Sequence, residues 1–239
     1  EAMMKKSYDS LEASRDSKIF QIENFFTQNL TDIGVLAHGA NVEELASDLN
    51  GLDEKINADA NGKYPVGHEL VKKVTEKHEE FFHKFMKDNG YYDIFLIDTK
   101  DGHVIYSVSK ESDYGANLKQ GSLKNSGLAE VMNKTVENRR ATFVDMKPYA
   151  PSGGTPSMFL GSPIDGKTDT ILVFQINAGA VTKTMQFRKG YGKTQEDYLV
   201  GPDHLMRSDS FLSPQEYSVK ASFANNKKVQ SIASKNALA

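Results

Sequence analysis

Apolar residues between positions 8 and 37 recur at intervals of three and four residues or their multiples. This period matches one face of an α-helix, so the segment is predicted to form one long amphipathic helix that ends near Ala37. Residues 8–18 hold few apolar side chains and many charges, which is typical of a helix end that projects from the body of a protein. The apolar stripe consists of Leu11, Ile19, Ile22, Phe26, Leu30, Ile33 and Leu36.

Two more helices are predicted before the first strand. Apolar residues at positions 42, 45 and 49 indicate a short helix that ends at Asn50-Gly51. The segment ELVKKVTEKHEEFFHKFMKDNG predicts one helix over residues 69–89, which Gly90 ends. His78 lies on the apolar stripe of this helix and is interpreted as a packing residue.

The β-strand signals follow these helices. In residues 92–108, two runs of aromatic and β-branched residues flank Asp101-Gly102, which predicts a β-hairpin. The segment GSLKNSGLAEVMNKTVENRR predicts a helix, and ATFVDMKPY, SMFLGSPI and TILVFQIN predict three further strands. Their short links are typical of antiparallel neighbours. The predicted fold class is therefore α+β, with the long N-terminal helix packed on an antiparallel five-stranded sheet.

The end of the chain weakly repeats its first strand pair. Residues 197–210, DYLVGPDHLMRSDS, have the same order of apolar run, turn and second run as residues 94–107. A helix-like segment, KKVQSIASKNALA, comes next. We therefore predict that residues 191–239 begin a second, smaller module and that the chain stops within it.

Composition excludes several classes of function. The 239 residues carry a net charge of −3 and a pI near 6.1, which gives no basic field for binding nucleic acid. The chain has no cysteine, so disulfides, thiolate metal sites and cysteine nucleophiles are excluded. No run approaches the roughly 18 apolar residues of a membrane span, so membrane attachment is expected only through segments outside this sequence.

No motif in the chain predicts catalysis, a metal or a cofactor. The closest pair of histidines, in HEEFFH, has a spacing of five, whereas a zinc-protease helix needs a spacing of four. The sequence KGYGKT does not match the phosphate-binding pattern G-x-x-x-x-G-K-[ST], and the serine-hydrolase pattern G-x-S-x-G does not occur. We therefore expect a protein with neither enzymatic activity nor a cofactor.

Polar residues interrupt the predicted strands and suggest a ligand site. A small-molecule cavity needs a few convergent polar groups within aromatic walls, and Phe159 and Phe174 can supply such walls. Because side chains alternate between the two faces of a strand, each polar residue can equally face solvent. The polar candidates in or beside the strands are Tyr106, Asp145, Tyr149, Ser157, Gln175 and Asn177.

Four segments carry a family resemblance. GYYDIFLIDTKDGHVIYSVSKESDYGANL, FVDMKPYAPS, GSPI and YLVGPDHLMRSDS resemble the extracytoplasmic double Cache (PDC, PAS-like) sensor region of bacterial receptors, most strongly that of methyl-accepting chemotaxis proteins. The resemblance covers the chain from about residue 10 to its end. It implies a stalk and helices over residues 1–60, a membrane-distal PAS-like (Cache) ligand-binding module over residues 61–190, and the beginning of a membrane-proximal module over residues 191–239.

The resemblance implies a ligand-binding sensory domain of a transmembrane chemoreceptor. Such a domain occupies the periplasmic or extracellular portion of a bacterial inner-membrane protein and transmits ligand binding through displacement of a helix. Related regions occur in membrane histidine kinases and nucleotide cyclases, so a sensor region of one of those proteins is an alternative. A structural dimerisation stalk is a third interpretation.

The expected ligand is a small polar molecule. Amino-acid-binding members of the family carry tyrosines, an arginine and a tryptophan ahead of a pocket aspartate, and this chain departs from that pattern because it has no tryptophan. A short carboxylate could instead be held by Lys110 and Lys147. Two copies of the N-terminal helix that pack in parallel along the apolar stripe would form a homodimer.

Overall fold

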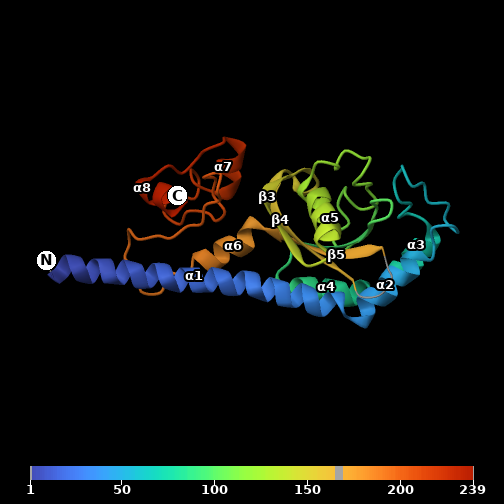
Figure 1. Ribbon diagram of the computed structural model, residues 1–239, viewed down its shortest axis with the longest axis horizontal. Helices are drawn as coiled ribbons and strands as arrows, with labels where there is room; N and C mark the ends of the chain where they lie inside the picture. The colour runs from blue at the N-terminus through green and yellow to red at the C-terminus, as the bar shows by residue number, and fades with distance from the viewer. Residues whose placement is uncertain (1, 165–168, 239) are drawn as a thin grey trace. The chain divides into compact units, whose positions relative to one another are not determined.

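Figure 1 shows a computed structural model of the chain, which describes residues 2–164 and 169–238. The chain folds into two compact units. The first, Leu30–Asn177, is called the sheet unit here, and the second, called the helical unit, combines the chain before Leu30 with the chain after Asn177. The functional boundaries expected after residues 60 and 190 stay a prediction.

The first two helices follow the sequence pattern. Helix α1 spans Ala2–Ala37, so its predicted end is confirmed, and α2 spans Ala40–Asn50. The last turns of α1 belong to the sheet unit, where Ile33 and Leu36 are buried. The sheet unit therefore begins with the apolar end of the long helix.

The helix predicted over residues 69–89 is in fact two helices. Helix α3 spans Glu69–Glu76 and α4 spans Glu79–Asn89. Between them, the backbone N–H of His78 bonds to the carbonyl of Thr75, three residues earlier, at 3.0 Å. This tighter turn ends α3 and starts α4 in a new direction. Gly90 ends α4, as predicted, in a left-handed conformation with φ of 74°.

The five predicted strands form one antiparallel sheet in the order β2-β1-β5-β4-β3. Helix α5 follows β2 and precedes β3 in the chain, and it lies across the sheet (Figure 1). The hydroxyl of Ser126 caps this helix by accepting a hydrogen bond from the backbone N–H of Ala129. The predicted α+β fold class is confirmed. The bounds are β1 Asp93–Asp98, β2 Val104–Ser107, α5 Gly127–Asn138, β3 Thr142–Tyr149, β4 Thr155–Pro163 and β5 Thr170–Asn177, with a short 3-10 helix at Ala150–Ser152.

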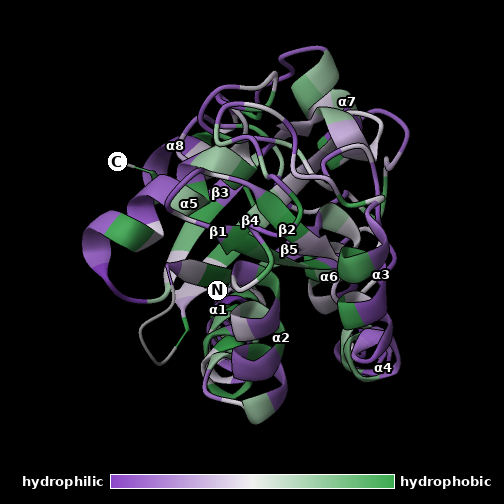
Figure 2. Cartoon of the chain, turned by 90° about the vertical axis from the view of Figure 1, so that its right-hand side faces the viewer, coloured by the Kyte–Doolittle hydropathy of each residue, from purple (hydrophilic) through white to green (hydrophobic). Residues whose placement is uncertain are grey.

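One face of the sheet, called the α5 face, packs on α5. Phe95, Phe159 and Val173 form a single buried core with Leu128 and Val131 of that helix. Figure 2 shows that hydrophobic residues are concentrated on the strands of the sheet. Burying side chains of this size contributes about 1.5–3 kcal/mol each, so this layer contributes strongly to the stability of the sheet unit.

The opposite face, called the α4 face, packs on aromatic side chains of α4. The ring of Phe82 lies 5.2 Å from that of Tyr106, and the ring of Phe85 lies 5.9 Å from that of Phe174. Near the C-terminal end of α1, Asp32 accepts a hydrogen bond of 2.7 Å from the hydroxyl of Tyr91. Helices therefore cover the sheet on both faces, which explains why all six residues of β1 are buried.

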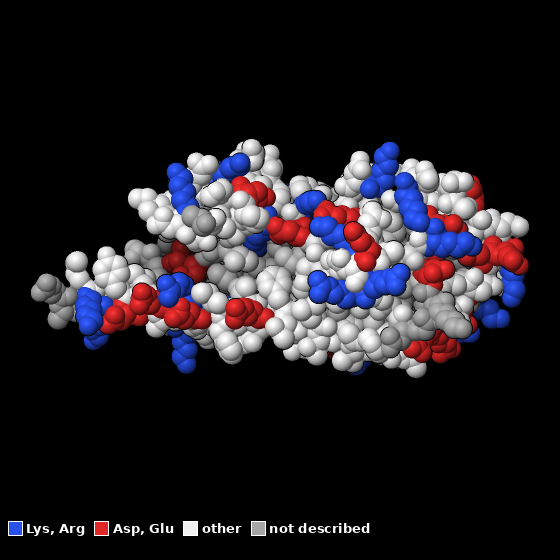
Figure 3. Space-filling model, viewed as in Figure 1, with Lys and Arg blue, Asp and Glu red and all other residues white. Residues whose placement is uncertain are grey.

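The helical unit contains residues 2–29 of α1 and three short helices. In place of a second strand pair, residues 197–210 form a single isolated β-bridge between Val200 and Met206. Figure 3 shows acidic and basic side chains interspersed on the face presented in Figure 1. No helix in the described ranges combines the length and apolar character needed to cross a bilayer. The short helices are α6 Ala178–Met185, α7 Val219–Ala224 and α8 Ile232–Ala237.

Candidate functional site

Polar side chains gather on the α5 face of the sheet, at the end where β1 begins and β5 ends. Asp93 of β1 and Phe159 of β4 each pair directly with Gln175 of β5, and paired residues of neighbouring strands point to the same face. Each member of this group, called the buried polar cluster, is at most 1% exposed. The members are Asp93, Ser107, Asp113, Tyr149, Ser157 and Gln175.

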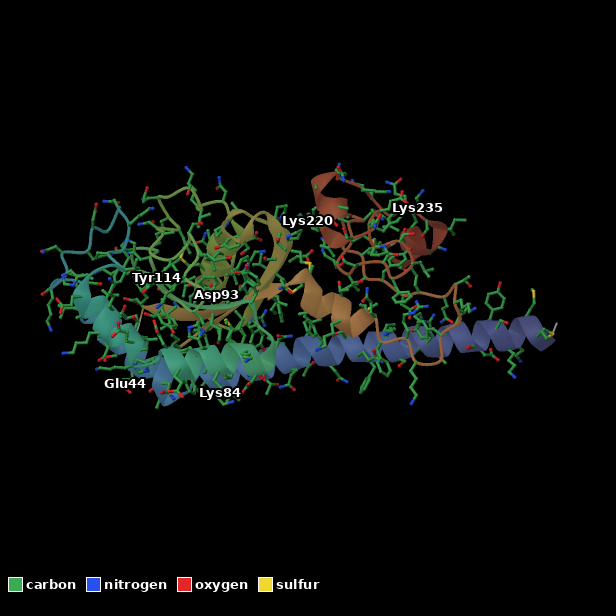
Figure 4. The ribbon with its side chains drawn as sticks, turned by 180° about the vertical axis from the view of Figure 1, so that it is seen from behind. Glu44, Lys84, Asp93, Tyr114, Lys220 and Lys235 are labelled. Atoms are coloured by element: carbon green, nitrogen blue, oxygen red, sulfur yellow. The ribbon has the colours of Figure 1, made fainter. Side chains whose placement is uncertain are left out.

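Asp93 is fully buried at the first position of β1 (Figure 4). Its Oδ1 accepts hydrogen bonds from the backbone N–H groups of Ile94, Val108 and Ser109 at 2.6, 2.9 and 3.0 Å. Its Oδ2 accepts one from the hydroxyl of Ser107 at 2.7 Å. Burial raises the pKa of Asp93 from 3.8 to about 6 despite these bonds, because the low-dielectric interior penalises the charged form. This carboxyl group therefore holds a proton more readily than an exposed aspartate.

Asp113 is the second buried acid of the cluster. Its Oδ2 accepts a hydrogen bond of 2.6 Å from the hydroxyl of Tyr149, the last residue of β3. Burial raises the pKa of Asp113, the bond from Tyr149 lowers it, and the nearby charge of Glu111 raises it again. Within residues 2–164 and 169–238, Oδ1 of Asp113 has no hydrogen-bond partner. One oxygen of this acid is therefore available as an acceptor.

Gln175 connects the cluster to the protein surface. Its Nε2 donates to the hydroxyls of Ser157 and Ser152 at 2.9 and 3.0 Å. Ser152 donates in turn to Glu111 at 2.7 Å, and the hydroxyl of Tyr92 donates to the other carboxylate oxygen of Glu111 at 2.7 Å. Among the residues that the structure describes, Oε1 of Gln175 has no hydrogen-bond partner. It is a second buried acceptor available to a donor.

A groove of about 450 Å³ lies beside the loops that supply the cluster. Its lining includes Ser112, which precedes Asp113, and Ala150, which follows Tyr149. Asn61 and Leu123 line it as well. The groove is therefore lined by direct sequence neighbours of two cluster residues.

The cluster contains two acids and no base in the described part of the chain. No lysine, arginine or histidine described there forms an ion pair with Asp93 or Asp113. A buried carboxylate without a cationic partner is costly unless it is protonated or accepts several hydrogen bonds. The arrangement therefore suits a ligand that donates hydrogen bonds and carries positive charge.

Comparisons with solved structures identify the fold. The sensor domain of the Vibrio cholerae histidine kinase DctB is 13% identical, with 97% of this chain and 76% of that chain covered and a TM-score of 0.54. The chain shares the fold of the DctB sensor domain. This finding agrees with the fold that the sequence resemblance implied.

Other similar solved structures give lower scores. The ligand-binding domain of the Campylobacter jejuni chemoreceptor Tlp3 is 11% identical, covers 81% of this chain and 65% of that chain, and has a TM-score of 0.49. The ligand-binding domain of the Pseudomonas fluorescens chemoreceptor CtaA, in complex with L-alanine, is 11% identical, covers 89% of this chain and 76% of that chain, and has a TM-score of 0.48. No model of a known protein family matches the sequence, and no curated protein does.

The structure brings four of the sequence-predicted site residues together. Tyr149, Ser157 and Gln175 belong to the buried polar cluster, and the ring of Phe159 stands edge-on to that of Tyr149 at 5.0 Å. Tyr106 and Phe174 are not with them, because both lie on the α4 face of the sheet. The hydroxyl of Tyr106 is buried there without a partner in the described ranges.

Asn177, the last residue of β5, is half-buried and pairs directly with Ser157. The other three predicted site residues lie outside the cluster. Lys110 forms an ion pair with Glu79 of α4, and Lys147 forms one with Glu130 of α5. Asp145 is exposed on β3 and accepts a hydrogen bond from the next backbone N–H at 2.7 Å. The two lysines expected to hold a carboxylate ligand are therefore engaged with acids at the surface.

Sequence reasoning missed Asp93, Ser107 and Asp113. Asp93 carried a usable signal, because it is a charged residue inside a strand that is otherwise almost wholly apolar. Asp113 had no such signal in the sequence, because it lies in a polar loop whose path depends on tertiary contacts. The cluster is consequently more acidic than the predicted site.

Proposed function

We propose that this chain is the extracytoplasmic ligand-binding sensor region of a bacterial transmembrane receptor. The shared fold with the DctB sensor domain supports this, as do the resemblance of the sequence to double Cache regions and the buried polar cluster in the sheet unit. In this function the chain binds a small molecule and carries out no chemical reaction. The sequence resemblance favours a chemoreceptor as the whole protein.

A histidine kinase is the second candidate for the whole protein. The observation in its favour is that the solved structure with a TM-score of 0.54 is a histidine kinase sensor domain. Both candidates use the same sensor function and differ in the cytoplasmic output domain. Identifying the domain encoded after this region decides between them.

We propose that the ligand is a small molecule with an ammonium group. The observation that carries this proposal is the pair of buried carboxylates, Asp93 and Asp113, for which the described residues supply no cationic partner. An ammonium group has donors to offer and no acceptor, so it complements Oδ1 of Asp113 and Oε1 of Gln175. An amine is favoured over a simple carboxylate because a carboxylate would face like charge at these acids.

Signalling requires that the ligand bind two conformations of the sensor with different affinity. Ser112 and Pro151, which line the groove, directly precede Asp113 and Ser152, and Ser152 accepts a hydrogen bond from Gln175 of the cluster. A cation held by Asp113 would favour the conformation in which the loop that carries Asp113 is closed on the sheet. The last turns of α1 pack in the same unit and would transmit the change as a helix displacement.

We further propose that two copies associate through α1. Large apolar side chains of the stripe are solvent-exposed, among them Leu11 at 52% and Ile19 at 49%. An exposed apolar stripe on a long helix is the feature that parallel helix pairing buries.

The ligand proposal is tested by titration calorimetry after a thermal-shift screen of amines, amino acids and carboxylates. Asp113→Asn keeps an acceptor for the hydroxyl of Tyr149 but removes the charge. Because hydrogen bonds to charged groups contribute about 1.5–3 kcal/mol, we expect this variant to bind the best amine roughly ten- to hundredfold more weakly.

The matched control is Asp145→Asn, which removes an exposed carboxylate outside the buried polar cluster. It should bind with wild-type affinity. Undiminished affinity in folded Asp113→Asn, or a screen in which only carboxylates without an amine raise the melting temperature, would contradict the proposed ligand class.

A further inference from the structure

Three potential metal ligands meet where α2 passes the turn that precedes α4. Glu44 and Asp48 lie four residues apart on α2, so their side chains share one face of that helix. His78 is the N-terminal cap residue of α4. One ligand atom from each of the three residues lies within 4.8 Å of the other two. Figure 4 labels Glu44, which is exposed on α2.

His78 is the buried member of this group. The residue is 4% exposed, and in the described part of the chain its buried Nε2 has no hydrogen-bond partner. Both ring nitrogens of an imidazole ordinarily bind a donor, an acceptor or a metal. A buried ring nitrogen without a partner, beside two carboxylates, therefore indicates a site for a cation.

The backbone holds His78 in place. Its N–H bonds to the carbonyl of Thr75 at 3.0 Å, and its carbonyl accepts from the N–H of Phe82 at 3.2 Å. Phe82 is fully buried, and its ring lies 5.2 Å from that of Tyr106 of the sheet at a tilt of 52°. The imidazole is consequently presented to α2 by a rigid turn, which is the preorganisation that a metal ligand needs.

One of the three ligands also lies near a lysine. The Nζ of Lys77 lies 3.9 Å from Oδ2 of Asp48, with the lysine side chain 56% exposed. An exposed ion pair of this length is weak, so a divalent ion can displace the lysine into solvent. The second group of potential ligands, Asp98, Asp101 and His103, differs because both oxygens of Asp98 accept backbone N–H groups and His103 contacts the carbonyl of Gly62.

We propose that Glu44, Asp48 and His78 form a binding site for a first-row divalent transition metal, with zinc as the reference ion. One imidazole and two carboxylates suit zinc and its neighbours, whereas calcium and magnesium prefer ligand sets made only of oxygen. A tetrahedral ion with bonds of about 2.0–2.2 Å holds its ligand atoms roughly 3.4 Å apart. Because the three ligand atoms lie within 4.8 Å of one another, binding would require side-chain rotations of the exposed Glu44 and the half-buried Asp48 to close the remaining distance.

The bound ion would fasten α2 to the turn between α3 and α4. Three protein ligands leave a fourth position open to water or to an external group. The site lies on α2 and the α3–α4 turn, whereas the buried polar cluster lies on the α5 face of the sheet. This proposal does not depend on the proposed ligand, and either can fail alone.

The test is calorimetric titration of the whole chain with zinc chloride, together with the absorption spectrum of its cobalt(II) form. The double variant Glu44→Gln/Asp48→Asn removes both carboxylate charges from α2 and leaves the buried histidine in place. Because changes in the surroundings of metal ligands alone weaken affinity about 10- to 100-fold, we expect at least a tenfold loss and a changed cobalt spectrum.

Two control variants make the result specific. Glu43→Gln removes the neighbouring exposed carboxylate of α2, and Asp101→Asn removes one from the second ligand group. Both should bind zinc as the wild type does. Equal affinity in the double variant and the wild type, or a loss confined to Asp101→Asn, would overturn the assignment, as would the absence of zinc binding by the wild type.

Discussion

The substitution Asp93→Asn isolates the buried acid that the sheet unit places at the start of β1. Asparagine has the same shape, and its carbonyl oxygen can accept the three backbone N–H bonds that Oδ1 of Asp93 accepts. Its amide can donate to the hydroxyl of Ser107, which already accepts from the N–H of Lys110 at 2.8 Å and has a second lone pair. The variant should therefore fold with the network intact.

The size of the effect follows from the pKa shift. Burial raises the pKa of Asp93 from 3.8 to about 6 in the folded protein, so between these values the folded state holds a proton that the unfolded state has released. The contribution of Asp93 to stability is fully present below the unfolded pKa of 3.8 and is lost as pH rises through the folded value of about 6. Because one pKa unit corresponds to about 1.4 kcal/mol, the loss by pH 7 is about 3 kcal/mol.

The assay is urea unfolding of the wild type and Asp93→Asn at intervals from pH 4 to pH 8. The variant carries no charge at this position, so its free energy of unfolding minus that of the wild type should rise by about 2 kcal/mol between pH 4 and pH 7, because at pH 4 the unfolded wild type is already partly deprotonated. Asp113 titrates in both proteins and largely cancels in the difference. A difference that stays flat with pH, or that falls as pH rises, would refute the assignment of Asp93 as a buried acid with a raised pKa.

Two further predictions concern packing. Gly161→Ala places a Cβ atom 2.4 Å from Oγ1 of Thr135 on α5, so this overpacking should cost about 1–3 kcal/mol in urea unfolding. Gly67→Ala, where a Cβ atom meets nothing within 4 Å, should change stability far less, and an equal loss in both variants would contradict the close approach of α5. Leu11→Asp puts a charge on the exposed stripe of α1 and should weaken self-association at least about tenfold in sedimentation equilibrium without lowering helix content. Wild-type association by this variant would exclude the surface around Leu11 as the dimer interface.

Much of the fold could be predicted because its signals are local. The end of α1 before Gly39 and the end of α4 at Gly90 follow from glycine at helix boundaries, and the opening hairpin follows from Asp101-Gly102. The break between α3 and α4 was not predictable in this way. The residues there, Lys77 and His78, are neither glycine nor proline, and the turn depends on burial of His78 against the rest of the unit.

The candidate site was only half predictable, for two different physical reasons. Gln175 and Phe174 are adjacent on one strand, so they must point to opposite faces, and the sequence alone contains the information that they cannot share one cavity. Asp93 was missed because β1 is buried on both faces and shows no alternation of polar and apolar residues. Asp113 reaches the cluster through a loop, and loop paths depend on contacts distant in sequence.

The strand order of the sheet has a consequence for biosynthesis. Strand β1 pairs with β5, the middle strand of the sheet, with Asp98 opposite Thr170 and Asp93 opposite Gln175. Because ribosomes add about 5–20 residues per second, β5 is synthesised on the order of ten seconds after β1. During that time the nascent chain exposes an apolar edge that can pair with other chains. The acid at the start of β1 and the charged side chains of α4 before it are charges of the kind that protect such an edge from aggregation.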